Sequence, residues 1–151
     1  MRQLFEDLTI ATGARGFHDL TPTLRRHLAA SGLREGLVQI SCLHTSCSLT
    51  VNENADPRVR ADLEAHFRAL VPEAGSRPIS GEGALRPYSH ADEGPDDMPA
   101  HLRTALTATS LGLSFREGRL LLGTWQAVYL WEHRDQSGLR RRLTLHWLGE
   151  D

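Results

Sequence analysis

Lysine is absent from this 151-residue chain, so all 17 of its basic residues are arginines. Reactions that need a lysine amine, such as Schiff-base formation or phosphate binding by a P-loop lysine, are therefore excluded. The chain also has no excess of positive charge, because its formal net charge is -2 at pH 7. Such a chain has no general attraction to nucleic acid or anionic lipid, and we expect no nucleic-acid partner.

Long apolar runs are also missing. No stretch approaches the roughly 18 apolar residues of a membrane-spanning helix. Glu6 and Asp7 stand where a secretory signal peptide has its apolar core. We therefore expect no membrane partner and a cytoplasmic location.

Cysteine is scarce, and its two positions are Cys42 and Cys47. If both lie on one strand, an odd separation directs their side chains to opposite faces, because side chains alternate along a strand. We therefore expect that they do not bridge each other. The sequence predicts two free thiols in a reducing compartment.

The remaining pattern predicts one domain over residues 1–151, since this length suits a single well-packed core. Apolar periodicity with proline and glycine boundaries predicts helices at 22–31, 57–71 and 98–107. In the third helix the residues expected to face inward are Met98, Leu102, Ala105 and Leu106. Strands are expected at 3–10, 42–56, 111–115, 119–122, 124–133 and 139–148. The glycine- and proline-rich segment 72–88 is predicted to be a flexible loop, either a lid or slack chain.

The stretch from Cys42 to Asp56 is the most informative of these strands. Alternation divides it into an apolar stripe fit for a core and a polar stripe without Arg, Asp or Glu. The polar stripe consists of Cys42, His44, Ser46, Ser48, Thr50, Asn52 and Asn54. Neutral hydrogen-bonding groups are the polar groups that a protein can bury when they satisfy one another. The stripe is therefore either an ordinary solvated strand face or the lining of a polar pocket or subunit boundary.

Three of the eight histidines stand where an ordered site is plausible: His44, His90 and His101. Three neutral imidazoles with an open fourth position form a catalytic zinc arrangement. Asp97 precedes His101 by one helical turn and could orient its imidazole. The alternative is that Asp97, like Asp96, is a helix cap and that His101 is a surface residue.

Two further groups of residues are candidates for ligand binding. Glycines around the segment 118–126 suggest that a ligand or another backbone comes close to Trp125 and Gln126, although core packing is the simpler interpretation of Trp125. Glu132 ends the same strand, and Arg140 and Arg141 follow the next turn. Guanidinium groups at a strand end suit phosphate binding. A solvated charged hairpin is the alternative.

Taken together, these motifs resemble those of the YjbQ-like proteins. The similar stretches are His44–Pro57, with its Thr-Ser-Cys-Ser-Leu-Thr-Val-Asn-Glu-Asn run, His90–His101, Gly118–Gln126 and Glu132–Arg134 with Arg140 and Arg141. The resemblance covers nearly the whole chain. It implies a single compact α+β domain with a mixed or sandwich-like sheet and about three helices. It also implies a homotrimer whose motifs meet in a pocket at or near the subunit boundary.

The same resemblance implies a weak thiamine-phosphate synthase activity, which joins hydroxymethylpyrimidine pyrophosphate to thiazole phosphate with loss of pyrophosphate. In this interpretation His44, His90 and His101 hold a divalent metal, zinc or magnesium, or shuttle protons, and no organic cofactor is expected. Asp97 or Glu53 supplies a carboxylate. The expected substrate-binding residues are Ser46, Asn52, Trp125, Gln126, Glu132, Arg140 and Arg141. A metal-dependent hydrolase or phosphatase of a small phosphorylated molecule, or a non-catalytic binding trimer, fits the same residues.

Overall fold

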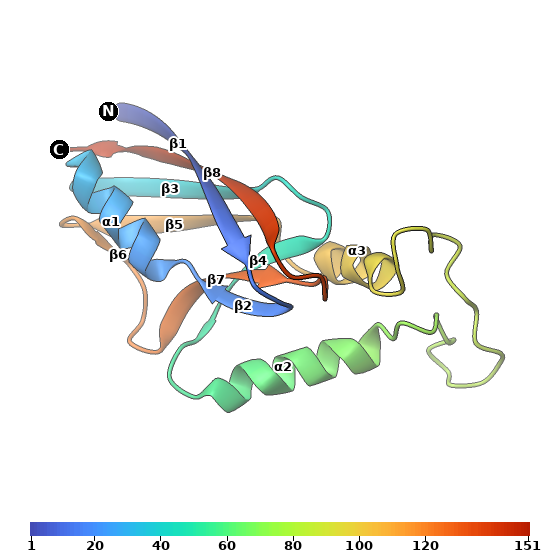
Figure 1. Cartoon of the computed structure of the whole chain (residues 1–151). Coiled ribbons are helices and arrows are strands. Elements are labelled where there is room, and N and C mark those ends of the chain that lie inside the picture. The colour runs from blue at the N-terminus through green and yellow to red at the C-terminus, as the bar shows by residue number, and fades with distance from the viewer.

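The computed structural model describes residues 1–151 as eight strands and three helices (Figure 1). In chain order these are β1 (Arg2–Thr12), β2 (Gly16–Asp19), α1 (Thr21–Ser31), β3 (Glu35–Cys42), β4 (Cys47–Glu53), α2 (Pro57–Leu70), α3 (Asp97–Leu106), β5 (Ser110–Arg116), β6 (Arg119–Leu120), β7 (Gln126–Glu132) and β8 (Leu139–Glu150). No helix is both long and apolar enough to cross a membrane. The expected single α+β domain with three helices is confirmed.

The strands form two sheets, of order β1-β8-β3-β5-β6 and β2-β7-β4. Every pair is antiparallel, so the expected alternative of a mixed sheet is wrong. Figure 1 shows α1 lying along the larger sheet, with α2 and α3 beside the smaller one. The β3–β4 turn is one of the connections at which the chain passes from one sheet to the other.

The core lies where the inner faces of both sheets meet α1. Leu24 and Leu28, one turn apart on α1, are fully buried and belong to the same cluster as Ile40 of β3, Leu130 of β7 and Trp147 of β8. Burying one such side chain stabilises the fold by roughly 1.5–3 kcal/mol. This shared core fixes the two sheets against each other.

A pair of glycines lets β3 and β8 approach closely. Gly36 and Gly149 are partners in the register of the two strands. A Cβ on Gly36 would lie 2.0 Å from the carbonyl oxygen of Leu148, and a Cβ on Gly149 would lie 2.4 Å from that of Glu35. Gly36 also has a φ of +151°, which L side chains rarely adopt. Both positions therefore require glycine.

The smaller sheet is covered on its second face by α2. Phe67 of α2 packs edge-on against Trp131 of β7, and the Trp131 indole N–H donates to Glu64. The predicted helix over 57–71 is confirmed, but none of its residues is fully buried, and Leu70 is 57 % exposed. The helix therefore contributes less core than its apolar stripe suggests.

The predicted strand from Cys42 to Asp56 is wrong at residues 43–46 and, because β4 ends at Glu53, at residues 54–56. Cys42 ends β3, residues 43–46 form a turn, and Cys47 begins β4 in the other sheet. Alternation therefore restarts after the turn: Leu43, expected in the core, is 50 % exposed, whereas Ser46 and Ser48 are buried. The two cysteine sulfurs lie 3.3 Å apart, so the prediction that they point to opposite faces is also wrong.

The inward face of α3 differs from the prediction. Its buried residues are Asp97, Pro99, Ala100, Arg103 and Thr104, while Leu106 is 59 % exposed. The helix turns a partly polar face inward because that face contacts other polar groups, namely His90 and Arg134. Apolar periodicity alone predicts the opposite orientation.

Candidate metal centre

Two imidazoles and a carboxylate converge at the start of α3. His90, Asp97 and His101 each offer one ligand atom, and these atoms all lie within 4.8 Å of one another. Asp97 Oδ2 lies 2.8 Å from His90 Nε2 and 3.4 Å from His101 Nε2. Asp97 is 2 % exposed, whereas His90 is open to solvent. The cluster therefore has a buried carboxylate and an accessible side.

Local structure explains why these groups meet. Asp97 and His101 lie one turn apart on α3, so their side chains share a face. His90 reaches them from the loop that precedes the helix, and Figure 1 shows this loop returning to α3 from a wide excursion. The arrangement thus combines one helical pair with one loop residue.

Arg134, which follows β7, holds the loop and the helix together. Its guanidinium donates to Asp97, to Asp96 Oδ2 at 2.9 Å and to the Glu93 carbonyl at 2.8 Å. Asp96 also accepts the Asp135 backbone N–H at 2.8 Å. Burial would raise the pKa of Asp96, but the Asp135 N–H and the Arg134 guanidinium hold it below its usual value. Asp96 is therefore an anchor for Arg134, and its side chain does not cap the helix.

The protonation of His101 gives the cluster its chemical character. His101 Nδ1 lies 2.8 Å from the Thr45 carbonyl oxygen, and a carbonyl can only accept, so Nδ1 carries the hydrogen. Nε2, on the other side of the ring, then faces the Asp97 carboxylate. The position between these two atoms suits a cation, either a proton on Nε2 or a metal ion.

The donor set indicates which metal ion would fit. Two ligands of one tetrahedral zinc ion, with bonds of about 2.1 Å, lie about 3.4 Å apart. The Asp97–His101 distance is 3.4 Å, whereas His90 and Asp97, hydrogen-bonded at 2.8 Å, would have to separate slightly to admit the ion. Imidazole nitrogens suit zinc and other transition metals, whereas magnesium prefers oxygen ligands. Of the two expected metals, the residues present therefore fit zinc better.

His44 does not join this cluster. Its Nε2 accepts the Arg142 backbone N–H at 2.7 Å, which leaves no lone pair for a metal. Burial, followed by the nearby guanidinium groups of Arg141 and Arg142, lowers the pKa of His44 and favours the neutral ring. The third member of the cluster, beside the imidazoles of His90 and His101, is thus Asp97 and not His44 as expected.

Two cavities flank the cluster. One, of about 370 Å³, is lined by His44, Thr45, His101, Thr104, Ala105, Thr107 and Thr109. The other, of about 320 Å³, contains His90 and is lined by Tyr88 and the ends of the 72–96 segment. The first presents imidazole and threonine groups and so can hold a polar ligand beside His101.

Glu132 and Arg141, expected to bind substrate, are instead paired inside the protein. The Arg141 guanidinium donates two hydrogen bonds of 2.6 Å to the Glu132 carboxylate, which also accepts from Thr12 at 2.8 Å. Burial would raise the pKa of Glu132, but these donors hold it below its usual value. With Glu132 0 % and Arg141 6 % exposed, neither can reach a phosphate, and both assignments are corrected.

The other expected ligand-binding residues lie at the far end of the smaller sheet. β4 and β7 pair from Cys47 with Glu132 at the metal-centre end to Glu53 with Gln126 at the other. Six residue steps along a strand span about 20 Å. Asn52, Glu53, Trp125 and Gln126 are therefore not part of the His90–Asp97–His101 site within one chain.

Local contacts explain these distant residues. Gln126 accepts the Gly123 N–H at 2.8 Å, Glu53 accepts the Ala55 and Asp56 N–H groups, and Asn52 accepts the Glu53 N–H at 2.8 Å. Trp125 is 63 % exposed, so the alternative that it packs in the core is also wrong. Among the remaining candidates, Ser46 is buried and Arg140 is exposed.

A buried polar pair near the site is not evident from the sequence. His133 Nε2 lies 2.8 Å from the Ser48 hydroxyl. Burial, followed by the Arg103 guanidinium, lowers the pKa of His133 to about 3. Ser48 lies on the predicted polar stripe, which was the available signal that a polar group is buried there.

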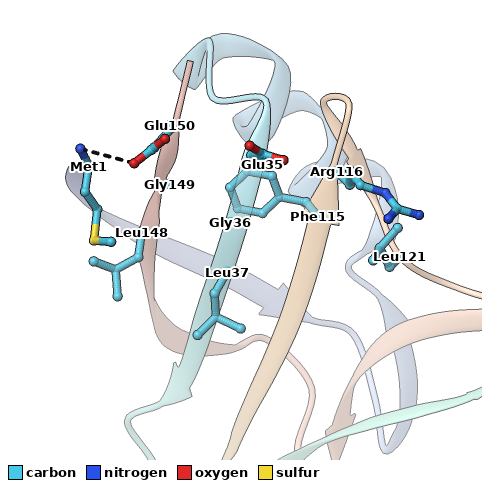
Figure 2. Close-up of a pocket in the computed structure, with 10 residues that line it drawn as sticks. All are labelled: Met1, Glu35, Gly36, Leu37, Phe115, Arg116, Leu121, Leu148, Gly149 and Glu150. Carbon is cyan, nitrogen blue, oxygen red and sulfur yellow. Dashed lines mark ion pairs between the residues drawn. The ribbon is translucent and has the colours of Figure 1, made fainter.

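A larger cavity, of about 530 Å³, lies at the opposite end of the larger sheet (Figure 2). Figure 2 shows Met1, Leu37, Leu121 and Leu148 around it, with the Phe115 ring between them. Its charged side chains are those of Glu35, Arg116 and Glu150, and none belongs to the metal centre. The groove is therefore separate from the candidate metal centre at α3.

Comparison with known proteins agrees with this fold. Residues 6–150 match the family described as UPF0047 protein YjbQ-like. The protein sll1880 of Synechocystis sp. is 45 % identical over 149 residues, covering 99 % of this chain and 94 % of the relative. YjbQ of Salmonella typhimurium is 44 % identical over 137 residues, covering 89 % of this chain and 90 % of the relative.

Two solved structures are also similar. Protein TT1486 of Thermus thermophilus superposes with a TM-score of 0.76 at 34 % identity, covering 95 % of this chain and 99 % of that one. Protein APE1520 of Aeropyrum pernix does so with a TM-score of 0.81 at 28 % identity, covering 97 % and 99 %. The chain is thus a small antiparallel α+β protein with a candidate histidine–carboxylate centre. It belongs to the YjbQ-like UPF0047 family, as its motifs predicted.

Proposed function

We propose that the chain is a zinc-dependent enzyme whose centre is His90, Asp97 and His101 and whose substrate is a small phosphorylated molecule. The observation that carries the proposal is the convergence of ligand atoms from His90, Asp97 and His101 within 4.8 Å of one another, with His101 Nε2 and Asp97 Oδ2 3.4 Å apart. A divalent ion bound there supplies positive charge to phosphate oxygens or acidifies a water. The protein contributes a buried carboxylate, held by Arg134, and an open side next to a polar cavity.

The residues of the chain have distinct roles in this proposal. The Thr45 carbonyl fixes the His101 tautomer, and Arg134 orients Asp97. His44, with Nε2 accepting from the backbone, presents its Nδ1 hydrogen as a donor. Because it lines the same cavity as His101, it is placed to position a ligand.

The reaction we propose first is the synthase type implied by the family, in which a pyrophosphate leaving group needs charge neutralisation. Hydrolysis of one phosphorylated substrate is the second candidate. It is favoured by the separation of Trp125 and Gln126 from the metal centre, since these expected substrate-binding residues cannot hold a second substrate beside the ion within one chain. The two reactions differ in products: a synthase consumes two substrates, and a hydrolase releases phosphate or pyrophosphate from one.

The test of the metal centre is elemental analysis of untagged protein and of the variants H101A and D97N, each incubated with zinc and then desalted. We expect about one zinc per chain in the parent and a loss of most of it in both variants. The matched control is H66A, which removes an exposed histidine of α2 and should retain the metal. Equal zinc in the parent and in H101A would overturn the proposal.

Activity is then measured on the zinc-loaded parent. Thiamine precursors are supplied together and singly, and phosphate, pyrophosphate and coupled product are followed. Coupled product formed only with both precursors supports the synthase, and phosphate from one precursor supports the hydrolase. Saturable binding with no product would indicate a non-catalytic binding protein.

We also propose a homotrimer and a cytoplasmic location, the latter because both cysteines are free.

A further inference from the structure

Two cysteine sulfurs meet inside the protein next to the turn that supports the metal centre. Cys42 Sγ and Cys47 Sγ lie 3.3 Å apart, from the last residue of β3 and the first of β4. Both thiols are free. A disulfide has a sulfur–sulfur distance of about 2.05 Å, so bond formation needs a movement of little more than an ångström.

We propose that Cys42 and Cys47 form a redox-active dithiol, which a peroxide oxidises to an intramolecular disulfide that closes a ring around residues 43–46. The two sulfurs are not equivalent. Cys42 is 8 % exposed and Cys47 is fully buried, so the peroxide reaches Cys42 first. Cys47 is placed to resolve the oxidised form.

The electrostatic surroundings agree with this division of roles. A hydrogen bond from the Cys47 thiol, followed by a backbone N–H and the Arg141 guanidinium, lowers the pKa of Cys42 against the opposing effect of burial. The thiolate is the nucleophilic form of cysteine. This agrees with the greater exposure of Cys42, which assigns it as the attacking sulfur in our proposal.

The chemistry balances with a peroxide as the sole oxidant. The Cys42 sulfur attacks one peroxide oxygen, the oxygen–oxygen bond breaks, and the departing oxygen leaves as water, so that Cys42 becomes a sulfenic acid. The Cys47 sulfur then attacks the Cys42 sulfur, the sulfur–oxygen bond breaks, and a second water leaves. Two electrons pass from the two sulfurs to the peroxide, and the two thiol hydrogens end in water.

The closed ring contains two groups of the polar cavity. One is His44, which lines the cavity. The other is Thr45, whose carbonyl accepts a 2.8 Å hydrogen bond from the His101 imidazole. Moving the turn disturbs that bond. The consequence, which rests on the proposed metal centre, is weaker zinc binding in the oxidised protein, by about tenfold or more, the effect typical of losing an outer partner of a metal ligand.

The experiment is differential alkylation of the full chain. Protein is treated with hydrogen peroxide, denatured, reacted with N-ethylmaleimide and weighed by mass spectrometry, with and without prior reduction. We expect two adducts before peroxide, none after it, and two again after reduction. Two adducts after peroxide, or a loss that reduction does not reverse, would overturn the dithiol.

Single variants identify the attacking sulfur. In C47A, which lacks the resolving thiol, peroxide should leave a sulfenic acid on Cys42 that dimedone traps, whereas C42A should react far more slowly. Equal trapping in both would overturn the assigned roles. Zinc titration of the reduced and oxidised parent completes the test. If neither the reduced nor the oxidised protein binds zinc, the proposed metal centre is wrong. The alkylation result still tests the dithiol in that case.

Discussion

At the scale of single residues, the structure distinguishes polar side chains that are free to act from those used for folding. Glu132 and Arg141 have the types expected for ligand binding, but they neutralise each other in the interior. Removing one member of such a buried pair typically costs about 3–5 kcal/mol, because the other charge is left unpaired. If an Arg141 variant loses activity, the expected cause is therefore destabilisation of the fold and not the loss of a ligand contact.

His133 predicts a specific dependence of stability on pH. Its pKa is about 3 when folded and about 6.5 when unfolded, so between these values the unfolded chain binds one more proton. The free energy of unfolding should then fall as the pH falls from about 6.5, by up to about 1.4 kcal/mol per unit. Denaturant unfolding at several pH values checks this.

The variant H133Q isolates that contribution. Its amide can still bond to the Ser48 hydroxyl but does not titrate, so its stability should fall less between about pH 6.5 and 5. Glu132, whose pKa is held low, loses its stabilisation only at more acidic pH. Parallel curves for parent and variant in the upper window would show that His133 does not cause the effect.

At the scale of elements, the metal centre depends on how α3 is held. The pairing of Asp97 with His101 is readable from the sequence, since it needs only one helical turn. His90 was predicted as well, but the replacement of His44 by Asp97 was not. It depends on Arg134, which lies 37 residues beyond Asp97 in the chain, and on the Arg142 N–H that occupies His44. Likewise, alternation predicted most strands but not the turn at 43–46, since a run of polar residues looks the same whether the chain continues or crosses to another sheet.

Arg134 can be tested apart from the ligands themselves. In R134A the Asp97 carboxylate loses its orienting partner while all three ligands remain, and zinc affinity should fall by about 10–100-fold. The measurement is competition with a chromophoric chelator. R119A, which removes an exposed arginine of β6, is the control and should bind zinc as the parent does. Equal affinities for parent and R134A would show that Arg134 acts only in folding.

At the scale of the whole molecule, the outer face of the larger sheet has no covering element. Phe5 is 67 % exposed and stacks on His146, and Leu37 is 39 % exposed beside the apolar groove of Figure 2. Gln39 and Thr144 lie on the same face, where the Thr144 hydroxyl donates to the Asp7 carboxylate. Such a surface suits contact between subunits, and we expect the proposed trimer to use it.

The variant L37E tests this assignment. A buried carboxylate at a subunit contact is costly, so light scattering after gel filtration should show monomers where the parent gives trimers. I79E places the same charge on a fully exposed loop position and should leave the trimer intact. A trimeric L37E protein with parental stability would move the interface elsewhere.

The glycine pair of β3 and β8 bears on how relatives of this chain can diverge. A substitution at Gly36 alone or Gly149 alone places a Cβ against the neighbouring backbone, and no single compensating side-chain change makes room, because the obstacle is main chain. A single substitution at either position therefore destabilises the fold, although neither glycine is near the metal centre. Identity at these two glycines in a distant sequence is evidence for the shared architecture, and it gives no information on shared chemistry.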